Sequence, residues 1–579
     1  MRLIRYIALI PLILLGCAKQ TTPTGGEKDE QPPTLIKSNP PDRQTNFKGN
    51  EIELTFDELV QVNAAREQII ITPSIGKKFE AEARKKTVIL KLNSELKDST
   101  TYTIMFRDAV QDLTERNPAV NLKLAFSTGS LIDSLSISGL VSSLLEDKLL
   151  KNYTVGLVPY HDTVNIFKHE AQWITITNDK GEYQLDNLKA GSYLLYAFDD
   201  KNKNLIVDSR NEAFAFKAKP LQLDSTVTQQ NLKTVLLDQR EFKLISARPI
   251  ARYFNVRTTK GIADYKVTPQ VDSIVISSFL EDISTVRIYN TFPQLDSLPV
   301  NIHFVDSATN TIDTLIYVKF DTRTSTKENF TTKITYAEFL QNKSVLKAEV
   351  TANKPILSIV TDSIFIQTDS VNRILFSTED ISYSEDRRKI YISKTLPKET
   401  DFTTKPPASG RISRERGEAA KEETAKEEKP TIPINNLILP ANTILSIESD
   451  SSAALHSSIK TITPDNSGVI SVELKTEENI LVQLLNKSFQ VIQESESKTA
   501  KFENLPPADY YIRVVLDKNK NGKWDPGNFF NKSEPEPMIF WKSEKGVPTT
   551  NLKANWEVGP LLINTENNVD NAESNTQKR

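Results

Sequence analysis

The pattern that most constrains this chain is an alternation of apolar and polar residues with a period of two. It runs through Glu51–Phe56, Thr87–Leu92 and Thr101–Phe106, and it returns at Thr314–Val318 and Lys389–Ile392. Successive side chains of a strand point to opposite faces, so alternation rich in β-branched and aromatic residues is typical of half-buried antiparallel strands. Turn residues separate these short runs, and no long amphipathic helical pattern interrupts them. The sequence therefore predicts an all-β chain built from β-sandwiches.

Length and charge narrow the organisation and the class of partner. A chain of 579 residues is too long for a single core and suggests about four domains. The 72 basic residues are outnumbered by 75 acidic ones, and no polybasic cluster stands out. A nucleic-acid partner is therefore not expected, nor is a basic patch that binds membranes.

The first residues have the pattern of a secretory signal. Arg2 and Arg5 form a positive head, and the apolar run Ile7–Leu15 has about half the ~20 residues needed to span a bilayer. The run ends Leu14-Leu15-Gly16-Cys17, which resembles the lipobox of bacterial lipoproteins. The resemblance implies cleavage after residue 16 and a covalent lipid on Cys17. The alternative is a lone buried cysteine within an ordinary secretory signal.

The remainder of the amino-terminal region predicts a tether. Residues 17–33 are polar and rich in Gly and Pro, which indicates a flexible stalk. Cys17 is the only cysteine, so no intramolecular disulfide can form. An exported chain of this kind depends on hydrophobic burial for its stability.

A group of short motifs follows the tether. They are Ser38-Asn39-Pro40, Leu54-Thr55-Phe56-Asp57-Glu58, Ile71-Thr72-Pro73, Thr101-Tyr102-Thr103-Ile104, Asp112 and Phe126-Ser127-Thr128-Gly129. On these residues the stretch resembles the SbsA-type bacterial Ig-like domain, which we place over residues 34–129. The head of the mature chain is similar to that of such lipoproteins in Bacteroidota. The resemblance implies a fold and a location in the cell envelope, but no reaction.

A second group of motifs predicts a different sandwich over residues 130–237. The motifs are Ser138-Gly139-Leu140-Val141, Gly181-Glu182-Tyr183, Leu188, Gly191 and Tyr193. They resemble the carboxypeptidase-regulatory or prealbumin-like β-sandwich, which is an accessory module without catalytic residues in the enzymes that carry it. The resemblance therefore implies a sandwich that brings no chemistry of its own.

Part of this segment is repeated later in the chain. LDNLKAGSYLLYAFDDKNKN, which starts at Leu185, matches FENLPPADYYIRVVLDKNKN, which starts at Phe502, with a constant offset of 317 residues. Two copies so far apart predict two sandwiches of one type with other domains between them. We place the second prealbumin-like sandwich over residues 431–563.

The segments around the second copy complete the predicted organisation. Residues 238–398 contain further alternating strands and are assigned to one or two divergent Ig-like domains. Residues 399–430 are rich in charge and alanine, which indicates a linker that is either disordered or partly helical. Residues 564–579 form a polar tail that is expected to be disordered.

The repeated segment ends in an acidic loop in both copies. Alternate oxygen-bearing side chains in a tight loop can face one centre, as Ca²⁺ requires. The spacing partly resembles calcium loops of EF-hand and dockerin-like motifs, although Asn211 and Asn528 stand where those motifs have a bidentate Glu. The alternative is a plain hairpin turn, because Asp, Asn and Gly favour turns. The candidate ligands of a structural Ca²⁺ are Asp517, Asn519, Asn521 and Asp525, with Asp200, Asn202, Asn204 and Asp208 in the first copy.

Signals of catalysis are missing from the sequence. It has no G-x-S-x-G or H-E-x-x-H motif, and its four histidines are scattered. No cofactor other than the lipid and the calcium alternative is expected, and we predict no enzymatic activity. A carboxylate pair hidden on a β-scaffold is the remaining catalytic alternative. Four tryptophans are candidates for stacking on sugars or for packing: Trp173, Trp524, Trp541 and Trp556.

Together these features predict a lipid-anchored scaffold without catalysis. Its expected partners are outer-membrane proteins, such as a β-barrel complex for barrel assembly or transport. The alternative is a surface lipoprotein that binds glycans or mediates adhesion. The expected location is the outer membrane, with the cell surface preferred by a small margin over the periplasmic face. The margin is small because the acidic run Glu27–Glu30 does not follow the cysteine directly.

Overall fold

The computed structural model describes residues 29–272, 275–291, 296–321, 327–368, 372–397, 400, 402 and 434–565. The predicted signal peptide, Cys17 and nearly all of the predicted charged linker and tail lie outside these residues. The chain divides into two compact units. The first is Met1–Ser136 with Gln172–Ile174 and Asp186–Lys189, and the second contains the remainder. Among the described residues, no helix is long and apolar enough to cross a membrane.

The first unit is a β-sandwich with one short helix. Its two main sheets have the strand orders β1-β2-β6-β5 and β4-β7-β9, and β3 pairs with β8. The alternation in β2 places Ile52, Leu54 and Phe56 in the core and the residues between them toward solvent. Its elements are β1 (Leu35–Asn39), β2 (Glu51–Phe56), β3 (Val60–Val62), α1 (Ala65–Gln68), β4 (Ile70–Thr72), β5 (Phe79–Arg84), β6 (Thr87–Leu92), β7 (Thr101–Met105), β8 (Val110–Asp112) and β9 (Lys123–Ser127).

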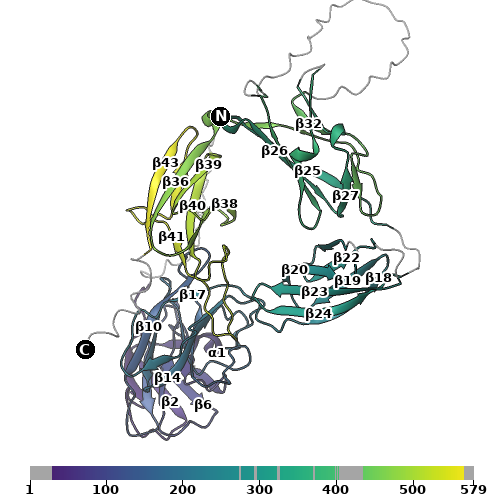
Figure 1. Ribbon diagram of the computed structural model, residues 1–579. Helices are drawn as coiled ribbons and strands as arrows, with labels where there is room; N and C mark the ends of the chain where they lie inside the picture. Colours follow the sequence, from purple (N-terminus) through teal and green to yellow (C-terminus); the bar gives the residue numbers. More distant parts are fainter. Residues whose placement is uncertain are drawn as a thin grey trace, which may run out of the picture. The chain divides into compact units, whose positions relative to one another are not determined.

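Two further sandwiches, one with β10 and β14 and the other with β36 and β40, are drawn in Figure 1. They have the same strand order, which agrees with the sequence repeat. In the first, the sheets are β13-β10-β17 and β12-β11-β14-β15, with β16 also paired to β14. In both copies a parallel pair joins the first and last strands, β10 with β17 and β36 with β43. The first copy consists of β10 (Leu135–Ser143), β11 (Thr154–Pro159), β12 (Trp173–Ile176), β13 (Glu182–Leu188), β14 (Gly191–Phe198), β15 (Phe214–Phe216), β16 (Leu221–Leu223) and β17 (Leu232–Thr234).

The second copy repeats this arrangement strand for strand. Its sheets are β39-β36-β43 and β38-β37-β40-β41, with β42 paired to β40. The inward residues of β36 and β40 form a core with Ile470, Val472, Ile512 and Val514. The elements are η4 (Pro464–Asn466), β36 (Gly468–Lys475), β37 (Ile480–Leu485), β38 (Val491–Ser495), β39 (Thr499–Leu505), β40 (Ala508–Leu516), β41 (Met538–Phe540), β42 (Thr549–Leu552) and β43 (Glu557–Asn564).

The first of two middle sandwiches follows the first copy. Its sheets are β18-β19-β22-β21 and β20-β23-β24, and Val256, Val286 and Phe304 lie in the core between them. Its strands are β18 (Leu244–Ile250), β19 (Tyr253–Thr258), β20 (Ile262–Pro269), β21 (Ser277–Phe279), β22 (Thr285–Ile288), β23 (Leu298–Asp306) and β24 (Thr311–Val318).

The second middle sandwich includes strands from both sides of the predicted linker. Its sheets have the orders β30-β31-β26-β25-β35 and β29-β28-β32-β34, and β27 pairs with β33. Its elements are β25 (Thr332–Leu340), η1 (Gln341–Lys343), β26 (Val345–Ala352), β27 (Ile356–Ile359), η2 (Thr361–Ser363), β28 (Phe365–Gln367), β29 (Arg373–Leu375), η3 (Thr378–Asp380), β30 (Ile381–Tyr383), β31 (Lys389–Thr395), β32 (Asn436–Leu439), β33 (Ile444–Ser446), β34 (Leu455–Ser458) and β35 (Lys460–Ile462).

This pairing corrects the predicted start of the second repeat. Residues 436–462 were assigned to the second prealbumin-like sandwich, but β32 pairs with β28, β33 with β27, and β35 with β25. Leu437, Leu439 and Ile444 join the core of the second middle sandwich. The charged segment thus interrupts one sandwich. The strands that follow it bury these apolar residues only against the strands that precede it. The all-β prediction itself is confirmed.

Candidate functional site

The first acidic loop begins two residues after β14 and is held by its own side chains. Asp200 accepts hydrogen bonds from the N–H groups of Asn204 at 3.0 Å and Leu205 at 3.2 Å. Asn202 Oδ1 also accepts from Asn204 N at 3.0 Å, and Asn204 Oδ1 accepts from Ile206 N at 2.8 Å. Short polar side chains that accept from the backbone a few residues ahead are the usual means of closing a turn.

The second acidic loop has the same geometry. Asp517 accepts from Asn521 N at 3.1 Å and from Gly522 N at 2.9 Å, and Asn519 Oδ1 accepts from Asn521 N at 3.1 Å. The backbone conformation is also repeated, because Leu205 and Gly522 both have a positive φ, of 60° and 70°. The predicted repeat therefore extends to the individual hydrogen bonds of the loop.

The aspartate at the end of each loop has different partners in the two copies. Asp525 Oδ2 accepts from the side-chain amides of Asn519 at 2.5 Å and Asn521 at 2.9 Å. Asp208 accepts from Asn211 Nδ2 at 2.8 Å instead. The second loop is therefore more tightly connected across its own turn.

A buried glutamate fastens each loop, and the sequence analysis did not single it out. Glu212, with 1% of its surface exposed, accepts from Lys201 N at 3.1 Å and from Asp208 N at 2.8 Å. Glu536, with 6% exposed, accepts from Lys518 N at 2.7 Å and from Asp525 N at 3.0 Å. Both carboxylates thus bind the same two backbone positions of their loops.

A weak signal for these glutamates exists in the sequence. Each stands two residues before an apolar strand, in Glu212-Ala213-Phe214-Ala215-Phe216 and Glu536-Pro537-Met538-Ile539-Phe540. The offset between them is 324 residues, whereas the loops are offset by 317. A search at one constant offset therefore misses the correspondence.

Burial shifts the pKa of Glu212, the buried glutamate that fastens the first loop. Desolvation raises the pKa of the Glu212 carboxyl, and the negative charge of Asp200 adds to the shift. Hydrogen bonds from the N–H groups of Asp208 and Lys201 oppose it, but the net direction is upward. Since burial disfavours the charged form, the protonated form of Glu212 persists to a higher pH than that of an exposed glutamate.

The loops satisfy their carboxylates with N–H donors. Within the described ranges, no group of three or more His, Cys, Asp or Glu side chains is arranged to hold a metal ion. The side-chain amide N–H groups of Asn519 and Asn521 donate to Asp525. This arrangement corresponds to the hairpin alternative, and calcium binding stays a prediction that titration calorimetry with Ca²⁺ tests.

Seven extra residues separate the second loop from its glutamate. Only three residues lie between Asp208 and Glu212, whereas ten lie between Asp525 and Glu536. We call residues 526–534 the insertion. Asn528 N donates to Ser533 O at 2.8 Å, and Ser533 N donates to Asn528 O at 3.0 Å, so the insertion closes as a small hairpin.

The insertion contacts the first copy and the first middle sandwich. Phe529 packs at 5.1 Å against the rings of Phe167 and Phe216, both edge to face. Asn528, with 2% of its surface exposed, donates to Ala308 O at 2.9 Å and to Asn310 Oδ1 at 3.1 Å. Three segments that are far apart in the sequence therefore meet at the insertion.

Strand β41 and its neighbours extend this contact between the two copies. Lys233 Nζ donates to Met538 O at 3.2 Å, and Arg513 Nη1 donates to Leu145 O at 3.1 Å. Ala218 N donates to Glu534 Oε1 at 2.8 Å. Each of these bonds uses a backbone group of one repeat, so together they hold the two repeats in a single relative position.

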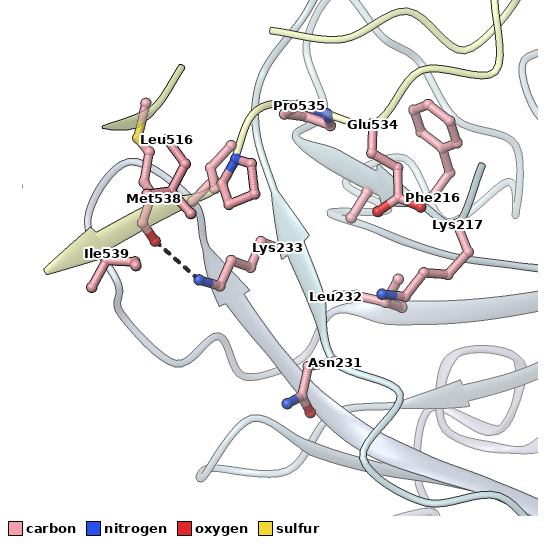
Figure 2. Close-up of a pocket in the computed structure, with 13 residues that line it drawn as sticks. Phe216, Lys217, Asn231, Leu232, Lys233, Leu516, Glu534, Pro535, Met538 and Ile539 are labelled. Carbon is pink, nitrogen blue, oxygen red and sulfur yellow. Dashed lines mark hydrogen bonds between the residues drawn. The ribbon is translucent and has the colours of Figure 1, made fainter. Parts of the chain in front are cut away.

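A cavity of about 120 Å³ lies at this contact. Figure 2 shows Phe216, Lys217 and Leu232 of the first copy on one side and Pro535 and Met538 of the second on the other. Its lining is mixed, because apolar side chains share it with the Lys217 ammonium group. No set of acid, base and nucleophile converges among the residues that line it.

A larger cavity of about 890 Å³ lies beside the insertion. Three aromatic rings line it together with amide, hydroxyl and charged side chains. The residues are Asn165, Phe167, Lys168, Ser209, Gln239, Arg240, Glu241, Phe242, Thr309, Asn310, Thr311, Phe530 and Asn531.

The tryptophans that were candidates for sugar stacking have different surroundings. Trp524 Nε1 donates to Glu536 O at 3.1 Å, so this ring is part of the second loop. Trp541 packs against the core of the second copy. Trp556 is 51% exposed, with Lys553 Nζ 4.8 Å from the centre of its ring. Trp173 lies in β12 and is half-buried. Among the four, Trp556 presents the most accessible ring.

The described histidines do not form a common site. His303 Nδ1 lies 2.6 Å from Asp313 Oδ1 on the surface of the first middle sandwich. His161 lies beside Thr163 at 2.8 Å. Neither contact belongs to a cluster that could coordinate a metal ion among the residues described.

Comparison with known families identifies the first sandwich. Residues 29–128 match the family described as bacterial Ig-like domain. The expectation of a bacterial Ig-like domain at 34–129 is therefore confirmed.

Comparison with other proteins adds little beyond this family. No curated protein matches the chain. Among solved structures, surface layer protein SbsC, domains 1–6, is 11% identical over 92% of this chain and 67% of its own, with a TM-score of 0.13. BcpA, the major pilin subunit of Bacillus cereus, is 9% identical over 75% of this chain and 99% of its own, with a TM-score of 0.13. At such TM-scores neither likeness carries an argument about function.

Proposed function

We propose that this chain is a non-catalytic scaffold that is anchored by a lipid on Cys17 and binds protein partners at an outer membrane. The observation that carries the proposal is the way the insertion fastens the second repeat to two other sandwiches. A scaffold must hold its binding surfaces at fixed spacing, and buried directional contacts such as those of Asn528 achieve this.

The serial β-sandwiches support this proposal. The matched family is an Ig-like domain, and a sandwich of this class can be present without any chemistry of its own. Contacts between sandwiches within one chain are commonly limited in area and permit motion. Here several buried polar contacts reinforce apolar packing between the two repeats and the first middle sandwich, which favours a fixed spacing of these three sandwiches.

The lipid anchor rests on the sequence and is tested separately. In cells that make the protein, Cys17→Ala is expected to abolish incorporation of labelled palmitate and to release the chain from the membrane fraction. Lys37→Ala, at an exposed position beyond the predicted tether, serves as the control and should leave both properties unchanged. Continued membrane attachment of the Cys17→Ala chain would contradict the anchor.

The scaffold role is tested by purification of the tagged full chain from gently solubilised envelopes. We expect a stoichiometric outer-membrane β-barrel protein to copurify, because a subunit of a complex remains bound under mild extraction. A chain that elutes alone, as a monomer, would contradict the role.

A second candidate function is glycan binding, and the larger cavity favours it. Aromatic rings that stack on sugars, together with amide side chains that bond hydroxyl groups, are the means by which proteins recognise saccharides. Phe530 is 54% exposed and lines the cavity with Asn310 and Asn531. Binding on a glycan array that is lost in Phe530→Ala but retained in Trp524→Ala would support it, and an empty array would refute it.

A further inference from the structure

Strand β24 forms one end of a three-stranded sheet in the first middle sandwich (Figure 1). It pairs antiparallel with β23 along its whole length, from Thr311 opposite Val305 to Val318 opposite Leu298. In the described part of the chain, no other strand pairs with β24. One side of the strand is therefore an unpaired edge, which we call the free edge, and β18 of the facing sheet lies near part of the strand.

The hairpin that connects β23 to β24 determines which backbone groups face this edge. Asp306 N donates to Asn310 O at 3.0 Å, and Thr309 N donates to Asp306 O at 3.1 Å. Hydrogen-bonded and non-hydrogen-bonded pairs alternate along an antiparallel ladder. Counting from the pair 306/310, the N–H and C=O groups of Asp313, Leu315 and Tyr317 are directed away from β23.

The sequence of β24 lacks the features that usually protect such an edge. Lysine, proline, glycine and bulges discourage pairing with another chain. Of the described sheet-end strands with eight residues, β20 contains Lys266 and Pro269, and β43 contains Gly559 and Pro560. The strand β24 reads TIDTLIYV and has none of these residues.

The side chains beside the free edge are compatible with an added strand. Leu315 is 41% exposed and Tyr317 is 65% exposed. The alternate residues, Ile316 and Val318, are buried in the core. The one charged residue of the strand, Asp313, is paired with His303. The exposed face of the strand thus carries two large apolar side chains beside the unpaired edge, and its one carboxylate lies 2.6 Å from His303 Nδ1.

We infer that the free edge of β24 binds an extended segment of a protein partner, which adds a strand to the sheet. Main-chain hydrogen bonds to Asp313, Leu315 and Tyr317 would supply affinity, and apolar side chains at alternate positions would cover Leu315 and Tyr317. The inference rests on the proposed scaffold function and names the surface that receives the partner.

The size of the edge favours an extended segment over a second copy of this chain. Eight residues of strand span about 26 Å. Two rigid copies that met only along such an edge would bury far less than the roughly 1,200 Å² of a stable interface. An extended segment can also follow the exposed face of the sheet, so it gains contact that a rigid copy does not.

Leu315→Pro is the direct test. Proline removes the N–H that faces the free edge, while the ladder to β23 uses the neighbouring residues, so the sandwich should remain folded. Capture of the envelope partner by the tagged full chain is expected to fall about tenfold, the effect of one lost hydrogen bond within an interface. Leu315→Thr keeps the N–H and is the matched control, with a smaller loss expected. Circular dichroism verifies the fold of both variants.

Hydrogen exchange of the wild-type chain provides a second readout that needs no variant. In the purified complex, the amides of Asp313, Leu315 and Tyr317 should exchange more slowly than in the isolated chain. Those of Ile312, Thr314 and Ile316 face β23 and should be protected in both states. Alternating protection of this kind is expected from an added strand and not from a contact made by side chains alone.

The outcomes distinguish the two proposals. A partner that binds wild type and Leu315→Pro equally, with unchanged exchange at the three amides, overturns the strand addition and leaves the scaffold function intact. A wild-type chain that elutes as a monomer without a partner overturns both. A wild-type chain that elutes as a homodimer, and as a monomer after Leu315→Pro, shows that a second copy occupies the edge and overturns the inference.

Discussion

At the scale of single residues, Asp112 illustrates how a motif residue acts. Its side chain is 2% exposed and accepts hydrogen bonds from the N–H groups of Thr114, Glu115, Arg116 and Asn117, at 2.6 to 2.9 Å. Burial by itself raises the pKa of this carboxyl, but the four N–H donors outweigh burial and lower it. The aspartate that carried the family resemblance is therefore the acceptor that closes the turn after β8.

The lowered pKa of Asp112 predicts a contribution to stability that depends on pH. The charged form is favoured in the folded state, so the stabilisation is present above the ordinary carboxyl pKa of about 3.9 and is lost as the pH falls through the folded pKa. Asp112→Asn should reduce the stability of the first sandwich by about 2 kcal/mol at pH 7, and by less at pH 3. Urea unfolding at both pH values measures this.

The control for Asp112 is Asp108→Asn, which changes an exposed carboxylate in the same loop region. It should be nearly neutral at both pH values. An Asp112→Asn effect of the same size at pH 7 and pH 3 would show that the charge of this carboxyl is not what stabilises the turn.

The buried glutamates make the second prediction at this scale. Glu536→Ala leaves the N–H groups of Lys518 and Asp525 without their buried acceptor, at a cost of about 2–4 kcal/mol. The melting temperature should fall clearly, whereas Glu544→Ala, at an exposed position, should not change it. Equal melting temperatures for the two variants would show that the hydrogen bonds of Glu536 add nothing to stability.

At the scale of elements, the insertion depends on a glycine with a positive φ. Gly527 has φ +75°, and a Cβ built there would lie 2.6 Å from Pro535 N and Ser533 O. Gly546 has φ +77° but open space around it, so it serves as a matched control. Gly546→Ala should cost about 1 kcal/mol, the backbone strain alone. Gly527→Ala should cost several times more, since it adds a clash with the backbone.

Thermal unfolding and limited proteolysis separate these two variants. In Gly527→Ala, displacement of the insertion should expose its hairpin to protease, and Gly546→Ala should resist cleavage like wild type. Equal destabilisation of both variants would mean that the close approach of Gly527 to Ser533 and Pro535 is not required.

The charged segment between β31 and β32 gives the second prediction at the scale of elements. Asn435 Nδ2 donates to Phe402 O at 3.2 Å, and Phe402 packs edge to face on Phe339 at 5.2 Å. The two ends of the segment therefore meet at the core. Replacing residues 404–433 with about six Gly and Ser residues should leave the melting temperature nearly unchanged, because loop length affects stability only weakly. A drop of more than about 5 °C would contradict this.

At the scale of the whole molecule, a buried charge network joins the two middle sandwiches. Lys354 Nζ is fully buried, 2.7 Å from Glu448 Oε2 and 2.8 Å from Asp450 Oδ2. Arg252 Nε and Tyr253 OH of the preceding sandwich also donate to Glu448, at 3.1 and 3.0 Å. Burial lowers the pKa of Lys354, but hydrogen bonds to the two carboxylates outweigh this and raise it. The ammonium group therefore stays charged.

Removal of this cation should affect both middle sandwiches together. Lys354→Met removes the buried cation that Glu448 and Asp450 share. Because Arg252 and Lys327 still pair with these carboxylates, the cost should lie at the lower end of the range for a broken buried ion pair, about 3 kcal/mol. Lys347→Met, at an exposed position of β26, is the control and should be nearly neutral. Unfolding followed by scanning calorimetry should show a downward shift for Lys354→Met alone. An unchanged thermogram would indicate that the network is dispensable.

The sequence by itself determined the features that repeat at short range. A period of two is a property of the strand, so the inward positions of β2 and β36 follow from the order of residues. The 317-residue repeat likewise predicted two sandwiches of one strand order, and the turn residues of the acidic loops predicted where the chain reverses.

Only the tertiary structure decided which distant segments associate. It assigned β32–β35 to the sandwich before the charged segment, brought Glu212 and Glu536 to their loops, and placed the insertion against Phe167 and Asn310. Periodicity reports which face of a strand is buried, but not which strand covers it. That choice depends on packing and hydrogen bonding between residues hundreds of positions apart, and no local pattern encodes it.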